Sequence, residues 1–192
     1  MTSSRAPVPA TRRRWGLVAV AGALLAVAAI AVESSFLQTM SRHGTSVFTW
    51  ELVGSSSRAD TVLTRWGATG RSAAVTASWI DFAFILGYTM ILFGLSRALA
   101  SRARGRGVIG GAILAETTAG VALAAGAANT VAKILQLVIL GWNTGQPLPG
   151  IGFAAAVLNY LLLLGAIVGC VALLLLNRRR PLGRTDIPSG VS

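Results

Sequence analysis

The sequence predicts an all-α membrane protein, a transmembrane bundle of four helices. Hydrophobic residues make up 54% of the 192 residues and charged residues only 12%, roughly half the charged share of a soluble domain. The mean hydropathy is +0.68. The apolar residues gather in four runs, each of which reaches the roughly 20 residues that a helix needs to cross the hydrocarbon layer. Backbone N–H and C=O groups in lipid must form hydrogen bonds with one another, so we expect these runs to be helices.

One domain, residues 15–176, contains all four predicted spans between two basic tails. The third run would form a helix of about 52 Å. It therefore tilts strongly, breaks near Gly126 to Asn129, or lies partly along the interface, and the sequence does not choose among these. The predicted segments are a tail at 1–14, spans at 15–36, 73–95, 108–142 and 151–176, an outer segment at 38–72, and a tail at 177–192.

The first run has a second interpretation. The arginines at 12–14, followed by an apolar run and Ala29-Ile30-Ala31, resemble a signal peptide with its cleavage motif. The run is at the long end for such a segment, which favours a retained helix. Cleavage would leave three spans.

The net charge of +11 would point to nucleic acid in a soluble protein. Here the arginines flank the apolar runs, which is typical of membrane topology and of contact with anionic lipids. We therefore expect membrane lipids as partners, and no nucleic acid. Four arginines lie in each tail and four between the second and third runs, whereas the other two connections hold four and none. This bias predicts an inner (plasma) membrane protein with both termini in the cytoplasm.

Single copies of cysteine and histidine, Cys170 and His43, restrict the chemistry. One cysteine excludes an internal disulfide and thiol oxidoreductases that use paired cysteines. One histidine excludes a histidine-rich metal site and bis-histidine haem ligation within one chain. No nucleophile elbow, phosphate-binding loop or metalloprotease motif is present. We expect no cofactor and no metal.

The outer segment contains a predicted amphipathic helix at 58–66. Its apolar residues recur at helical spacing, and Gly67 follows as a stop signal. We expect this helix on the outer membrane surface or on the mouth of the bundle, with Trp66 at the level of the headgroups. The apolar positions are Ala59, Val62, Leu63 and Trp66.

Residues 58–88 carry a pattern that includes Trp66-Gly67, Gly70-Arg71, Asp81-Phe82-Ala83-Phe84-Ile85 and Tyr88. It resembles an uncharacterised family of small four-span bacterial integral membrane proteins. The resemblance implies the four-span architecture and marks four residues for testing: Trp66, Arg71, Asp81 and Tyr88. It supplies no reaction.

Polar residues within the spans suggest a site, because charges inside a membrane are costly. At 100° per residue, Asn129, Lys133 and Gln136 fall within an arc of about 60° on one helix. Asp81 and Tyr88 share a face of another helix at a similar depth. Two such faces in one bundle should meet rather than contact lipid.

We therefore expect Asp81 to pair with Lys133 inside an outward-opening polar pocket, with Glu33 at its rim. Alternatively, the pair only fixes helix register, or Lys133 extends to the headgroups. Exchanging the two charges should restore the expression that either single change loses. The other expected lining residues are Tyr88, Asn129, Gln136 and Asn159.

The leading functional hypothesis is a non-enzymatic membrane protein that binds a small amphiphile, lipid or partner at this pocket. A second is a scaffold that forms homo-oligomers or holds another membrane protein through small-residue faces such as Gly165 to Gly169. A third is a membrane-embedded enzyme that uses Asp81 or Glu116 as acid or base, or a transporter.

Overall fold

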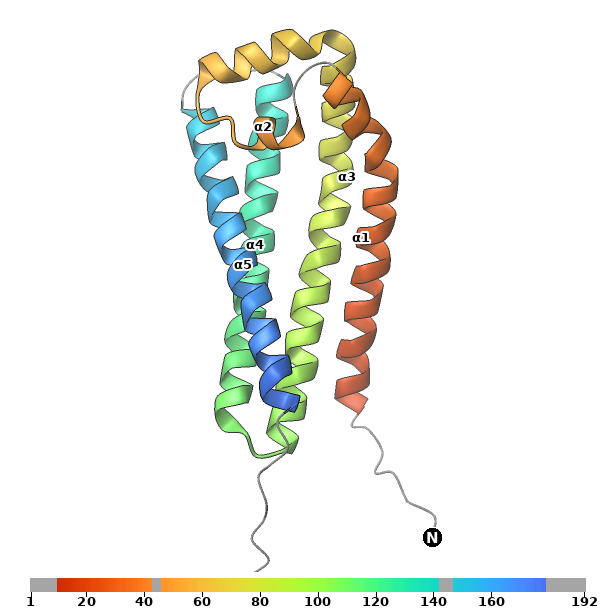
Figure 1. Cartoon of the computed structure of the whole chain (residues 1–192), viewed down its shortest axis with the longest axis vertical. Coiled ribbons are helices and arrows are strands. Elements are labelled where there is room, and N and C mark those ends of the chain that lie inside the picture. Colours follow the sequence, from red (N-terminus) through yellow and green to blue (C-terminus); the bar gives the residue numbers. More distant parts are fainter. Residues whose placement is uncertain (1–9, 43–45, 142–146, 179–192) are drawn as a thin grey trace, which may run out of the picture.

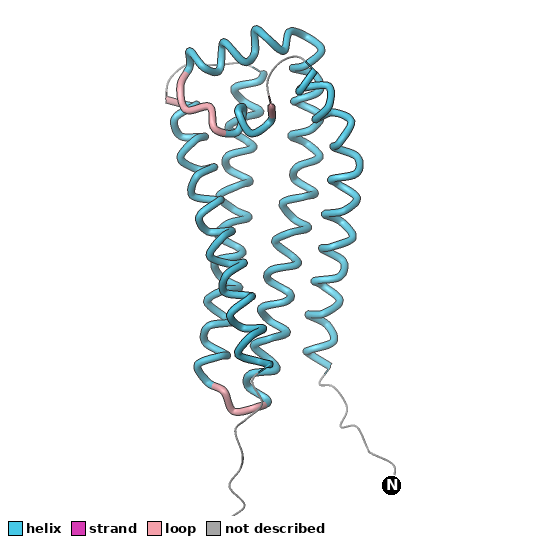
Figure 2. Tube along the Cα trace, viewed as in Figure 1, coloured by secondary structure: helices cyan, strands magenta, loops and turns pink. Residues whose placement is uncertain are grey.

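Five helices make up the part of the chain that the computed structural model describes, residues 10–42, 46–141 and 147–178 (Figure 1). Those ranges contain no strand (Figure 2). The all-α prediction is confirmed, and the long helices α1, α3, α4 and α5 are each long and apolar enough to cross a membrane, as expected of a multi-pass membrane protein. The helices are α1 (Ala10–Arg42), α2 (Val47–Glu51), α3 (Ser56–Gly105), α4 (Ile109–Gly141) and α5 (Leu148–Arg178).

The helices extend beyond most of the predicted spans. The connection expected after residue 95 is helical up to Gly105, because α3 continues past the apolar run. α4 is one unbroken helix, so the break considered near Gly126 does not occur. Glu116 of α4 forms ion pairs with Arg104 and, at 3.7 Å, with Arg97, close to the α3–α4 turn. His43 and most of the two predicted tails lie outside the described residues.

α3 changes direction at Gly67, which has φ 56° and ψ −159°. This combination is accessible essentially only to glycine. Residues 56–66 consequently lie across one end of the bundle, and the rest of α3 runs along it (Figure 1). The predicted amphipathic helix and its stop at Gly67 are both present.

We call α2 together with residues 56–66 the cap. Its apolar residues Ala59, Val62, Leu63 and Trp66 are all buried in the protein. Trp66 is 1% exposed and lies against Trp50 of α2, with ring centroids 5.3 Å apart. Of the two expected positions, the structure places this helix on the mouth of the bundle, with Trp66 buried against α2; its depth relative to the headgroups stays a prediction.

α3 is the central helix, and small residues let α1 approach it closely. A Cβ atom at Gly87 would lie 2.7 Å from the backbone nitrogen of Ala26 and 2.9 Å from the carbonyl oxygen of Gly22. α1 packs almost entirely on α3, which also contacts α4 and α5. The predicted small-residue motif that ends at Gly169 also packs inside the chain, against Thr118 of α4.

Candidate functional site

A polar cavity of about 240 Å³ lies below the cap and is lined by residues from all five helices. Most of the lining residues belong to α3, α4 and α5, and α1 and α2 contribute Glu33, Leu37 and Glu51. All seven residues that the sequence predicted for the polar cluster line it. They are Glu33, Asp81, Tyr88, Asn129, Lys133, Gln136 and Asn159.

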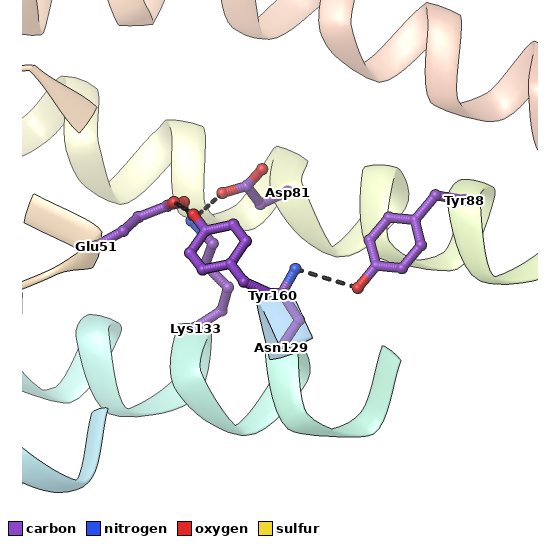
Figure 3. Close-up of polar contacts among 6 residues, drawn as sticks. All are labelled: Glu51, Asp81, Tyr88, Asn129, Lys133 and Tyr160. Atoms are coloured by element: carbon purple, nitrogen blue, oxygen red, sulfur yellow. Dashed lines mark hydrogen bonds and ion pairs between the residues drawn. The ribbon is translucent and has the colours of Figure 1, made fainter. Parts of the chain in front are cut away.

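Lys133 is the charged centre of the cavity and is 4% exposed (Figure 3). Its Nζ forms the predicted ion pair with the carboxylate of Asp81. It also donates a hydrogen bond of 2.6 Å to Oε1 of Glu51. One ammonium thus holds two carboxylates from different helices, α2 and α3.

Glu51 reaches Lys133 because the cap holds α2 inside the bundle mouth. Trp50, which precedes Glu51, and Val53, two residues after it, are both buried in the apolar cluster of the cap. The second oxygen of Glu51, Oε2, accepts a hydrogen bond from the hydroxyl of Tyr160 on α5 (Figure 3). The side chain of Glu51 is 18% exposed, so protein groups replace most of its water.

A second set of contacts, centred on Tyr88, links α3, α4 and α5. The Tyr88 hydroxyl donates to Oδ1 of Asn159 at 3.2 Å. It accepts a hydrogen bond from Nδ2 of Asn129 at 3.3 Å (Figure 3). These neutral groups fix the relative positions of three helices at the deeper part of the polar face.

Glu33 and Gln136 are buried lining residues that take part in neither of these two sets of contacts. Glu33 is 7% exposed, and its carboxyl group interacts with that of Asp81. Gln136 is 4% exposed, and its Oε1 accepts no hydrogen bond from any described residue. An unsatisfied buried acceptor is costly, about 1–3 kcal/mol, unless a further molecule supplies the donor.

Sequence reasoning missed Glu51 and Tyr160. The available signal was a lone carboxylate in the apolar stretch 47–53, outside the predicted spans. Because Glu51 is a second partner of Lys133, the expected charge exchange needs correction: Lys133→Asp would place a carboxylate beside Glu51 even when residue 81 is lysine.

The two outer-segment candidates do not line the cavity. Trp66 supports the cap, as described above, and Arg71 is exposed on α3 beyond the turn at Gly67. Cys170 is buried elsewhere in the bundle, with its Sγ 3.4 Å from Oγ of Ser96.

The described residues contain no group of three histidine, cysteine, aspartate or glutamate side chains placed to hold a metal ion. The arrangement instead offers charge and hydrogen bonds in a partly enclosed space, which suits recognition of a polar group. Comparisons with protein-family models, curated proteins and solved structures find no match to this chain.

Proposed function

We propose that the protein binds the polar group of a small amphiphile or lipid in the cavity below the cap. The observation that carries this proposal is a concentration of charge: the only lysine of the sequence and three of its six acidic residues line one cavity. Structural pairing of Asp81 with Lys133 needs two residues and no cavity. A space larger than the roughly 150 Å³ that accommodates benzene favours a ligand.

The position of the cavity supports an amphiphile over a purely water-soluble ligand. The cavity lining includes Tyr160 of α5, which is 38% exposed, so the cavity reaches the outside of the bundle beside α5. Apolar side chains such as Leu161 and Leu164 of α5 are also exposed there. A polar group inside the cavity would therefore lie next to a surface suited to an apolar tail.

The test is native mass spectrometry of the protein released from a mild detergent. Wild type should carry a defined extra mass. Ala156→Leu fills part of the cavity without changing its charge, since Ala156 is buried and lines it, and should lose that mass. Glu116→Gln is the matched control, because Glu116 lies about 25 Å along α4 from Lys133 and should keep the mass. A bare wild-type protein would contradict ligand binding.

We further propose that the protein resides in a bacterial inner membrane with both termini in the cytoplasm. The arginine bias supports this orientation, and the described ends of α1 and α5 near the two tails lie at the bundle end opposite the cap (Figure 1). In this orientation the cavity lies toward the outer end of the bundle, below the cap. A fluorescent protein fused to the C-terminus should fluoresce, whereas a phosphatase fused there should be inactive; the reverse would overturn the orientation.

The close contact between α1 and α3 supports a retained first helix. Cleavage after Ala31 would remove Gly22 and Ala26, which pack on Gly87. The mature protein should therefore keep the mass of the full first helix.

A further inference from the structure

The cavity contains more carboxyl groups than cations. Glu33, Glu51 and Asp81 line it together with a single ammonium, that of Lys133. If all four groups are ionised, the site carries two negative charges in excess. Buried charge of this kind is costly until protons or a bound cation neutralise it.

Among the groups that line the cavity, those that lack a donor partner are hydrogen-bond acceptors. Lys133 and Tyr160 donate to the two carboxylate oxygens of Glu51. Lys133 also contacts one carboxylate oxygen of Asp81, Oδ2. The Glu33 carboxyl interacts with the Asp81 carboxyl and has no ion pair with a cationic side chain in the described residues. Gln136 adds a buried Oε1 without a donor. A ligand that satisfies this cavity must therefore donate hydrogen bonds as well as carry positive charge.

A primary ammonium group meets both requirements. It has three N–H donors and one positive charge. The acceptors stand on separate helices, Glu33 on α1, Asp81 on α3 and Gln136 on α4, so several directed donors suit them. A quaternary ammonium has the charge but no donor, and would leave Gln136 unsatisfied.

We infer that the ligand carries a primary ammonium group, which binds through the carboxyl groups of Glu33 and Asp81 and the side-chain carbonyl of Gln136. This inference rests on the proposed ligand-binding function and names the chemistry of the ligand. The amine belongs either to a membrane amphiphile or to a small free molecule.

The experiment measures binding of matched probes to the full chain in lipid nanodiscs, by calorimetric titration. The probes are octylamine, octyltrimethylammonium, octanoate, octanol and, as a free amine, ethylamine. Octylamine should bind at least about tenfold more tightly than each of the other octyl probes, as a hydrogen bond to a charged group implies. Comparable binding of ethylamine would identify a free amine as the source, and weak binding of ethylamine an amphiphile; either supports the ammonium site.

Variants locate the binding. Glu33→Gln removes one carboxylate that has no cationic partner, and Gln136→Leu removes the unpartnered acceptor. Each substitution should weaken the binding of octylamine about tenfold. Glu116→Gln also removes a carboxylate, but at the opposite end of α4, and should leave binding unchanged.

Three outcomes distinguish failure of the ammonium inference from failure of the proposed function. Tighter or equal binding of octanoate or octanol would overturn the ammonium inference while ligand binding in the cavity stands. Equal binding of octyltrimethylammonium would overturn the role of Gln136 and the primary amine. Failure of every probe, together with a bare protein in mass spectrometry, would overturn the proposed function itself.

Discussion

Lys133→Met should destabilise the bundle much more than Asp81→Asn. Methionine keeps the approximate length of the lysine side chain but removes the ammonium from two carboxylates, those of Glu51 and Asp81. Their side chains are 18% and 11% exposed, so water cannot replace the lost cation. Leaving one side of a buried ion pair without its partner costs about 3–5 kcal/mol.

Asp81→Asn acts differently because Lys133 keeps its 2.6 Å contact with Glu51. The change also lowers the excess of carboxyl groups in the cavity. We expect a loss of at most about 2 kcal/mol, close to the value for one hydrogen bond to a charged group. From the sequence alone, a change of charge at Asp81 was expected to lose expression; the contact with Glu51 leaves Lys133 with a partner when Asp81 is removed.

The assay is reversible unfolding in mixed bicelles by addition of a denaturing detergent, followed by tryptophan fluorescence. Glu116→Gln is the control for loss of a carboxylate, since its side chain is 48% exposed and its ion pairs contribute about 1 kcal/mol or less. If Asp81→Asn lowers the free energy of unfolding as much as Lys133→Met does, the shared-lysine arrangement is refuted. A harmless Lys133→Met would refute the buried ion pairs altogether.

Three further predictions concern the fold that positions the cavity. Gly67→Ala should cost about 1–3 kcal/mol in the same unfolding assay, because a Cβ atom there meets no other atom and only backbone strain changes; an unchanged free energy would contradict the observed turn. Gly87→Ala should cost about 1–3 kcal/mol by overpacking and should increase proteolysis between α1 and α3, whereas wild-type protease resistance would argue against their close contact. Trp66→Ala should cost about 3–5 kcal/mol but leave membrane insertion intact, as measured by alkali extraction; extraction of the variant from the membrane would contradict its role in the cap.

The fold and much of the cavity lining follow from periodicity alone. Helix length and apolar composition predicted the long helices, and the 100° step placed Asn129, Lys133 and Gln136 on one face. Opposite charge then identified Asp81 as a partner for Lys133. These inferences succeed because a helix in lipid fixes the direction of each side chain, so a polar face must meet another polar face.

Glu51 could not be found in the same way. It ends a helix of five residues, too short for its periodicity to indicate a buried face. Its burial depends on the contact between Trp50 and Trp66, which joins two segments of the cap. Tyr160 was missed because it stands 100° from Asn159 on α5, so helical spacing does not place it on the same polar face, although its hydroxyl reaches Glu51.

The order of charges along the chain constrains how the protein is made. Glu33, Glu51 and Asp81 all precede Lys133, so the three carboxyl residues of the cavity are synthesised and delivered to the membrane before its one cation. An unpaired charge in lipid is costly. Until α4 is inserted, these carboxyl groups must therefore stay at the membrane interface or enter the membrane as neutral acids. A nascent chain that stops before α4 therefore lacks the lysine counter-charge. The insertion of α4 supplies it, and α5, which follows, completes the bundle and the cavity lining.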